Sequence, residues 1–161
     1  MPSGFVHDGP DLLFRHSSIV AAPSARVFRW HERPEALLDL MPLHRWVRIE
    51  QQVNGLRDGG RVTIAVGAGP FRLRWEARHF GFIQDEQFCD EQLRGPFALW
   101  RHTHRFEAMG PDQTLYEDRV EYRLPGGRIT NWFGAPVVRR LLTRMFEWRH
   151  QVVHQAMAQA Q

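Results

Sequence analysis

The sequence predicts an α+β fold: an antiparallel sheet of about seven strands, two short helices after the first strand, and one long C-terminal helix covering the sheet. From Gly134 to Ala158, apolar residues recur three and four positions apart, as on one face of a helix. This stripe consists of Val138, Leu141, Met145, Trp148, Val152 and Ala156. Between Trp46 and Leu124, alternating segments separated by glycine-containing turns are typical of an antiparallel meander.

The first part of the chain predicts one strand followed by two short helices. Residues Leu12–Val20 alternate between two faces and form the first strand. A short helix is expected over Ser24–His31, with Ser24 placed to cap its first turn. A second short helix spans Glu35–Leu40 and stops at Pro42, because proline does not continue a helix.

Six further strands and the long helix complete the order. The strands are expected at Trp46–Val53, Arg61–Val66, Phe71–Ile83, Glu86–Leu93, Phe97–Ala108 and Thr114–Leu124. Pro136 lies near the expected start of the helix, where its missing N–H costs nothing. The apolar stripe is widened by Leu142, Phe146 and Val153. Because the sequence contains no linker or repeat, we expect residues 1–161 to form a single domain, with residues 1–10 as a flexible N-terminal segment.

Composition excludes several classes of function. All 21 basic residues are arginine, and the sequence pI is about 9.9. Without lysine the chain has no amine for Schiff-base chemistry or for P-loop phosphate binding. The arginines alternate with acids and form no basic patch, so no nucleic-acid partner is predicted. No apolar run has the length of a membrane span and no signal pattern opens the sequence, which favours a cytoplasmic protein.

Four segments together resemble the START-like or SRPBCC superfamily, and in particular its bacterial polyketide cyclase/dehydrase-like members. They are VAAPSARVFRW at 20–30, GPFALWRHTHRF at 95–106, YEDRVEYRLPGG at 116–127 and RMFEWRH at 144–150. The resemblance implies a helix-grip fold, in which a curved sheet wraps around the C-terminal helix and leaves a deep cavity. It does not imply one activity, because members bind lipids, hormones or pigments, cyclise polyketides or assist other enzymes, and some are fused to an epimerase-like domain.

Strand alternation predicts which side chains face that cavity. In each strand the apolar set, not the arginine-rich set, is expected to point inward. For the long middle strand and the last two strands the inward sets are Leu73, Trp75, Ala77 and His79; Trp100, His102, His104 and Phe106; and Tyr116, Asp118, Val120 and Tyr122. We therefore expect a ligand to contact His16, Trp75, His79, Trp100, Phe106, Tyr122, Met145 and Trp148.

Among the residues predicted to face the cavity, the polar ones could take part in catalysis or metal binding. A pair formed by His102 or His104 with Asp118 could act as a general acid or base, but the sequence favours the alternative, a satisfied polar network that holds adjacent strands together. His102 and His104 could also both face one metal ion, but with a single inward acid in view no metal and no cofactor is predicted. Cys89 is expected to fill a strand, and Arg149 is left open between the surface and an anionic ligand.

Three functions remain open. The leading one is binding of a small apolar, aromatic or lipid-like molecule between the sheet and the C-terminal helix. The second is a cyclase, dehydratase or hydrolase that uses the His–Asp pair; the sequence favours the binding module over this enzyme. The third is a partner module of an epimerase-like protein, whose signature would be a large exposed apolar patch that the sequence does not show.

Overall fold

The computed structural model describes residues 11–42 and 44–159 and has the predicted order of elements. The predicted flexible segment, residues 1–10, lies outside the described residues. The elements are β1 (Leu12–Val20), α1 (Ser24–His31), α2 (Ala36–Asp39), a 3₁₀ turn η1 (His44–Trp46), β2 (Val47–Val53), β3 (Arg61–Ala68), β4 (Phe71–Ile83), β5 (Gln87–Arg94), β6 (Leu99–Gly110), β7 (Gln113–Arg123) and α3 (Gly127–Gln159). No helix among the described residues is long and apolar enough to cross a membrane.

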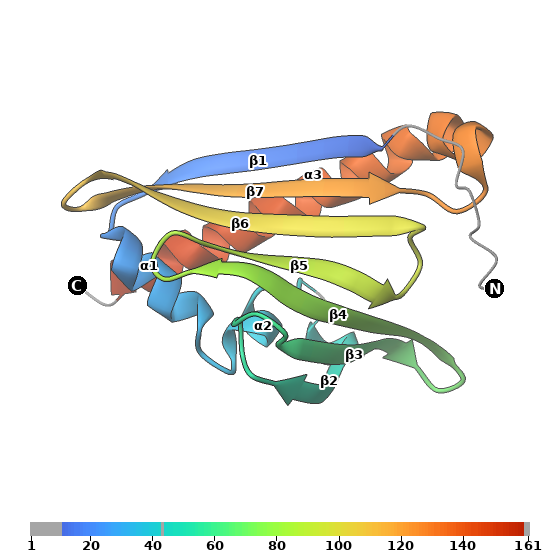
Figure 1. Cartoon of the computed structure of the whole chain (residues 1–161), viewed down its shortest axis with the longest axis horizontal. Helices are drawn as coiled ribbons and strands as arrows, with labels where there is room; N and C mark the ends of the chain where they lie inside the picture. The colour runs from blue at the N-terminus through green and yellow to red at the C-terminus, as the bar shows by residue number, and fades with distance from the viewer. Residues whose placement is uncertain (1–10, 43, 160–161) are drawn as a thin grey trace.

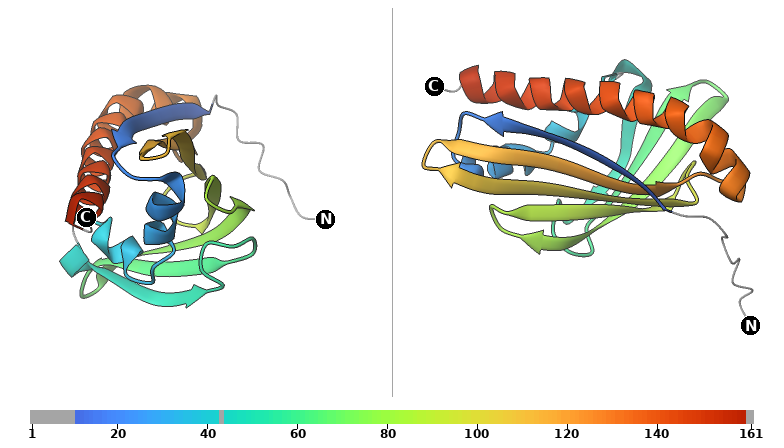
Figure 2. Two further views of the ribbon diagram at one scale, coloured as in Figure 1. Left: turned by 90° about the vertical axis from the view of Figure 1, so that its left-hand side faces the viewer. Right: turned by 90° about the horizontal axis from the view of Figure 1, so that it is seen from above.

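All neighbouring strands pair antiparallel in one seven-stranded sheet of order β1-β7-β6-β5-β4-β3-β2. Strands β2 to β7 form a meander. The last strand, β7, pairs with β1, which forms one edge of the sheet. Figure 1 shows α3 running behind the β1, β7 and β6 side of the sheet. In the end view of Figure 2 the sheet curls, with α3 on one side and the short helices α1 and α2 across one end. The predicted helix-grip architecture is therefore confirmed.

The strand faces also follow the predicted alternation. In β7, Tyr116, Asp118 and Val120 are fully buried, while the alternate residues are exposed or half-buried. A bulge in β4 lies between Phe80 and Ile83, where Gly81 has a φ of 62° that favours glycine. Because this bulge follows the inward residues of β4, it leaves their common face intact.

The long helix begins earlier than the sequence predicted. Helix α3 starts at Gly127 and not at Gly134, so Pro136 lies inside the helix. The early start is supported by Asn131, whose Oδ1 accepts a hydrogen bond from the backbone N–H of Leu124 at 2.9 Å. Proline removes one backbone hydrogen bond from a helix interior, and the N-terminal part of α3 is inclined to the rest of the helix in Figure 2.

The helix is also rotated relative to the predicted stripe. Leu141 and Trp148, placed at the centre of that stripe, are 60% and 42% exposed. The buried face consists of Leu142, Phe146, Arg149, His150, Val153 and Met157. Two of these residues, Arg149 and His150, are polar and have buried hydrogen-bond partners. The spacing of apolar residues alone does not identify such positions as buried. The residues predicted to flank the stripe are therefore its true centre.

Candidate functional site

A cavity of about 390 Å³ lies on the concave side of the sheet. Helix α3 packs mainly against β1 and β7, so the curled sheet around β3, β4 and β5 is covered instead by the short helices α1 and α2. The apolar lining comes from α2, the loop after it and the inward faces of β3 and β4, and includes Leu37, Met41, Val62, Ile64, Val66 and Trp75. The volume lies within the range of small-molecule sites, which are mostly apolar with a few polar groups.

Aromatic rings form one part of the cavity wall. Trp75 of β4 and Trp100 of β6 meet edge to face, with ring centroids 5.1 Å apart. Phe97 contacts both of them at 5.7 and 4.8 Å. All three residues line the cavity, as does Met145 of α3. These rings provide a rigid, flat surface for a planar or apolar ligand.

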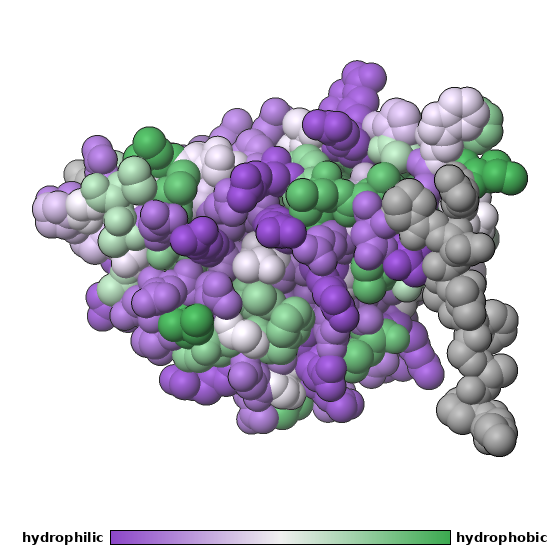
Figure 3. Space-filling view, turned by 45° about the horizontal axis from the view of Figure 1, so that its top comes forward, coloured by the Kyte–Doolittle hydropathy of each residue, from purple (hydrophilic) through white to green (hydrophobic). Residues whose placement is uncertain are grey.

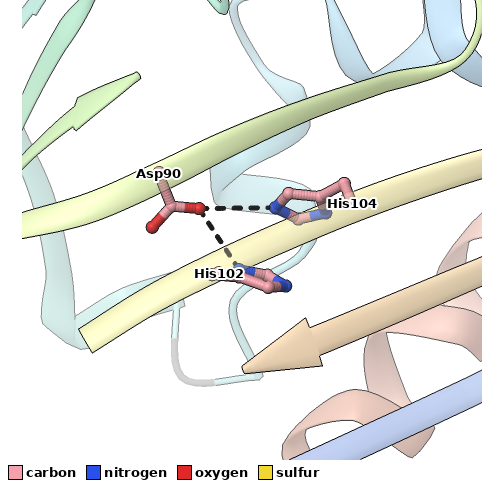
Figure 4. A group of neighbouring side chains, drawn as sticks. All are labelled: Asp90, His102 and His104. Atoms are coloured by element: carbon pink, nitrogen blue, oxygen red, sulfur yellow. Dashed lines mark ion pairs between the residues drawn. The ribbon is translucent and has the colours of Figure 1, made fainter. Parts of the chain in front are cut away.

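A polar group lies in the same wall, as Figure 4 shows. Asp90 projects from β5 toward His102 and His104 of β6. Asp90 Oδ2 is 3.2 Å from His102 Nδ1 and 3.5 Å from His104 Nε2. All three residues line the cavity, and the Asp90 side chain retains 17% of its exposure. Asp90 is therefore the carboxylate that a bound molecule would meet.

A second carboxylate, Asp118 of β7, lies behind the two imidazoles and is fully buried. Its Oδ1 is 2.9 Å from His102 Nε2 and 2.8 Å from His104 Nδ1, while its Oδ2 is 2.9 Å from His150 Nε2 of α3. The contacts of His102 and His150 are hydrogen bonds, whereas the N–H of His104 is directed too far from the oxygen for one. The imidazoles of His102 and His104 thus lie between two acids, one deep and one at the cavity.

Hydrogen bonds extend this group to β1 and to the next turn of α3. The His150 Nδ1 atom lies 2.7 Å from Ser18 Oγ, and the same oxygen is 3.0 Å from His154 Nε2. His16 packs edge to face on His150 at 4.3 Å. These contacts explain why the polar residue His150 is buried, since it joins Ser18 to Asp118 in a connected network.

The two acids and His102 have opposite pKa shifts. Burial acts to raise the pKa of Asp118, but the charge of His104 and the hydrogen bonds from neighbouring imidazoles hold it well below the usual range. Burial also acts to raise the pKa of Asp90, and the charges and hydrogen bonds of His102 and His104 again lower it. For His102, burial lowers the pKa, while Asp90 and Asp118 raise it above the ordinary value. Both carboxylates are therefore ionised at neutral pH.

His79 of β4 is a further polar residue of the cavity wall. It lies directly opposite Asp90 in the β4–β5 pairing and is 7% exposed. Its Nδ1 atom is buried and has no hydrogen-bond partner among the described residues. Burial lowers its pKa, so the ring is neutral at physiological pH. An unpaired buried nitrogen in a cavity wall is a position where a ligand atom would be stabilised.

Arg149 of α3, which the sequence left open, lines the cavity and is 8% exposed. Its Nε donates a hydrogen bond to the carbonyl oxygen of Leu40 at 3.2 Å, and the guanidinium lies over the Phe146 ring at 5.1 Å. Among residues 11–42 and 44–159, no carboxylate forms an ion pair with it. A buried cation without an acid is costly, so an anionic ligand atom would be favoured here.

The structure divides the predicted site residues into two groups. The cavity brings together Trp75, His79, Trp100, His102, His104 and Met145. Outside its lining lie His16, Phe106, Asp118, Tyr122 and Trp148. Phe106 and Tyr122 are buried in the apolar core, Asp118 lies behind the imidazoles, and Trp148 is partly exposed on α3. The register therefore identifies the inward faces correctly, but inward residues near α3 pack against the helix and do not reach the cavity.

Asp90 was not among the residues predicted to face the cavity, because only one acidic residue, Asp118, was expected there. The alternation of Phe88 and Asp90 with Cys89 already contained the signal, because buried Phe88 marks the inward face of β5. Cys89 lies on the other face, where its thiol donates to Thr103 Oγ1 at 3.5 Å and burial raises its pKa. This agrees with the filling role expected for the cysteine.

The first half of α3 carries exposed apolar side chains that the sequence did not predict as a patch. Ile129, Trp132, Phe133, Val137 and Leu141 are between 60% and 77% exposed. Figure 3 shows apolar atoms gathered at the end of the molecule where α3 begins. Trp132, the most exposed of these residues, faces outward and lies away from the cavity lining.

Comparison with known proteins identifies solved structures with the same fold. No curated protein matches the chain. Norcoclaurine synthase from Thalictrum flavum, solved with dopamine and hydroxybenzaldehyde, has a TM-score of 0.74 at 12% identity, covering 100% of this chain and 95% of that one. The aromatase/cyclase ZhuI from Streptomyces sp. R1128 has a TM-score of 0.65 at 14% identity, with 92% and 94% covered. At these identities the likeness shows the fold alone.

A third solved structure is more similar in sequence. The nucleoside-diphosphate sugar epimerase from Corynebacterium glutamicum has a TM-score of 0.68 and 28% identity, covering 88% of this chain but only 28% of that one. The family model described as polyketide cyclase / dehydrase and lipid transport matches residues 20–147, which is most of the chain and includes all of the cavity-lining strands. This chain therefore belongs to the polyketide cyclase / dehydrase and lipid transport family of START-like proteins.

Proposed function

We propose that this protein binds a small, mainly apolar molecule in the cavity between the sheet and α3. The observation that supports this most strongly is the cavity itself, about 390 Å³ in volume and lined by the aromatic group Trp75, Phe97 and Trp100. A family whose description includes lipid transport, and a fold neighbour solved in complex with dopamine and hydroxybenzaldehyde, agree with it. The composition of the cavity wall indicates the ligand class. The ligand would have a flat or chain-like apolar surface and one end that reaches the polar groups of the wall.

The polar end of the ligand is proposed to be an acidic oxygen group held by Arg149. The guanidinium is buried in the cavity wall, where it donates to the carbonyl oxygen of Leu40 at 3.2 Å and, more weakly, to Met41 Sδ at 3.8 Å. A carboxylate, sulfonate or phosphate would neutralise its charge and accept its remaining N–H donors in a bidentate arrangement. The cavity would then bind an amphipathic acid in preference to a neutral molecule of the same shape.

Calorimetric titration with two matched dyes tests both parts of this proposal. Anilinonaphthalene sulfonate carries an anionic group, and phenylnaphthylamine presents the same rings without it. We expect both to bind the wild-type protein and the anion to bind more tightly. The cavity variant Val66→Trp fills the pocket from β3 and should abolish both titrations. The control Arg72→Trp adds the same ring on the outer face of neighbouring β4 and should leave both unchanged.

The variant Arg149→Met tests the anionic end separately. It keeps an apolar side chain of similar length over Phe146 and removes the charge. The sulfonate should lose about tenfold or more in affinity, in keeping with a charged hydrogen bond worth roughly 1.5–3 kcal/mol, while the neutral dye keeps its affinity. Equal binding of both dyes to Val66→Trp and to wild type would overturn the cavity proposal, and an unchanged preference in Arg149→Met would overturn the anionic end.

A second candidate function is proton transfer on a bound carbonyl compound, as in a cyclase or dehydratase. His102 favours it, because this residue lines the cavity while its Nε2 lies 2.9 Å from Asp118. In this scheme His102 Nδ1 accepts the proton from carbon, and Asp118 stabilises the imidazolium that forms. The test is deuterium exchange at the central carbon of an acetoacetyl thioester in heavy water, followed by NMR. Exchange faster than buffer in the wild type and lost in His102→Asn is expected; exchange at the buffer rate in both contradicts it.

A third candidate is a partner module for an epimerase-like protein. It is supported by the likeness to 28% of the Corynebacterium glutamicum epimerase chain and by the exposed apolar residues of α3. Co-expression with the remaining part of that epimerase should allow co-purification, and the double variant Trp132→Ser, Phe133→Ser should prevent it. Absence of co-purification with the wild-type chain would contradict this candidate.

A further inference from the structure

Asp90, His102 and His104 have the geometry of a ligand set for a metal ion. Their candidate ligand atoms all lie within 4.8 Å of one another, and two of the separations, 3.2 and 3.5 Å, are close to hydrogen-bonding contact. With metal–ligand bonds of about 2.0–2.2 Å, adjacent ligand atoms around one ion are roughly 3.0–3.5 Å apart. Two edges of the triangle already fit, and the third is no longer than 4.8 Å; Figure 4 shows the three side chains around this point.

Asp118 provides the outer support that metal-binding histidines normally have. Ligating imidazoles usually donate their other N–H to a carboxylate or carbonyl, which fixes the tautomer and orients the ring. Here the far nitrogens of His102 and His104 both approach Asp118 Oδ1, at 2.9 and 2.8 Å. The hydrogen bond from His102 Nε2 to Asp118 places the proton on that side, so His102 Nδ1 presents its lone pair toward Asp90. His104 Nδ1 lies beside the same oxygen without a hydrogen bond, and the same tautomer would leave its Nε2 lone pair facing Asp90.

With the histidine protons on the Asp118 side, three hydrogen-bond acceptors face one another without a donor between them. Asp90 Oδ2 is an anion, and His102 Nδ1 and His104 Nε2 face it at 3.2 and 3.5 Å. Three acceptors converge stably only when positive charge lies among them, supplied by a shared proton or by a cation. Two carboxylates with 17% and 0% side-chain exposure make the local charge strongly negative, and a divalent ion would compensate both.

The same three residues face the cavity, so an ion bound there would keep open coordination positions. His79, in register with Asp90, adds a fourth donor on this wall, with a buried Nδ1 that has no partner among the described residues. Two or three imidazoles with one carboxylate and an open position are the donor set of zinc and related transition-metal sites.

We propose that Asp90, His102 and His104 form a binding site for one divalent transition-metal ion of the zinc class, with Asp118 as the outer carboxylate and with open coordination toward the cavity. The site goes beyond ligand binding as proposed above. It does not depend on the identity of the organic ligand, because the metal-binding residues are distinct from Arg149 and the aromatic wall.

The test uses the full chain, stripped with a chelator and titrated with Zn²⁺ by calorimetry and with Co²⁺ by visible absorption. We expect one Zn²⁺ per chain, a raised midpoint of thermal unfolding, and cobalt bands characteristic of nitrogen and oxygen ligands. Asp90→Asn preserves shape and removes the only anionic ligand; it should weaken binding at least as much as the roughly 10–100-fold loss typical of an outer-shell change. His104→Asn should do the same.

His154→Asn is the matched control, since His154 belongs to the same hydrogen-bonded network but contacts Ser18 instead of the proposed site. It should bind Zn²⁺ like the wild type, which separates the site from general histidine affinity. Circular dichroism and thermal unfolding without metal establish that each variant is folded. Absence of stoichiometric binding, or equal affinity in wild type and Asp90→Asn, would overturn the proposal and leave a shared proton as the charge that joins Asp90 to His102. The dye titrations would be unaffected by that result.

Discussion

The concave face of the sheet is used in two different ways at its two ends. Over β1 and β7 it is covered by α3 and fully packed, with Val20, Val120 and Phe146 at 0% exposure. Over β3 and β4 the same kind of inward apolar residue, such as Val66, lines a cavity. The buried acids and histidines lie between these halves. A single helix is too narrow to cover a strongly curled sheet, so one half becomes core and the other becomes a site.

The largest contrast is expected from truncating an apolar side chain in each half. Phe146→Ala removes a fully buried ring from the packed half and should lower the free energy of unfolding by about 3–5 kcal/mol. Leu73→Ala, at the 45% exposed rim of the cavity half, should cost less than about 1 kcal/mol. Urea unfolding of the two variants measures this. Similar losses would mean that the cavity half is as tightly packed as the core.

The second prediction concerns the boundary between the halves. Asp118→Asn leaves His102, His104 and His150 facing a neutral amide and should destabilise the fold by about 3 kcal/mol, because breaking a buried charge network leaves charges unpaired. Asp112→Asn, on an exposed turn, is the control and should change stability by less than about 0.5 kcal/mol. A variant of Asp118 as stable as the control would show that this network contributes little to the fold.

The third prediction concerns the pH dependence of the free energy of unfolding. It arises from His31, which contacts both halves of the concave face. Burial lowers its pKa from 6.5 to about 3, and its Nδ1 lies 2.8 Å from the Val27 carbonyl oxygen. The folded state therefore binds fewer protons than the unfolded state between these values. Its contribution to stability is full above pH 6.5 and falls with decreasing pH, by at most about 1.4 kcal/mol per pH unit. Urea unfolding between pH 7 and pH 4 should give a shallower slope for His31→Phe than for the wild type.

The smallest effect is expected at Trp148, which the sequence placed at the centre of the helix stripe. Because the side chain is 42% exposed, Trp148→Ala should lower the free energy of unfolding by less than about 1 kcal/mol, far less than Phe146→Ala two positions away. It should also leave the dye titrations unchanged, since Trp148 does not line the cavity. A large loss in either measurement would contradict the observed rotation of α3.

Much of the candidate site could be predicted from the sequence because it lies on strands. Side chains alternate with a period of two whatever the partner, so His79, His102 and His104 were assigned to the inward face from their neighbours alone. The part that failed lies on the helix. A period of 3.6 tolerates a rotation of one position, and the buried partners of Arg149 and His150 decided that rotation.

The sequence by itself determined the order of the elements, the antiparallel meander and the inward faces of β4, β6 and β7, because these depend on spacing between neighbouring residues. Only the tertiary structure decided where the sheet loses contact with α3 and which inward residues line the cavity. It also decided that Asp90 of β5 lies beside His102 and His104 of the neighbouring strand β6. Those outcomes depend on sheet curvature and on the pairing of buried charges, both of which arise between residues far apart in the chain.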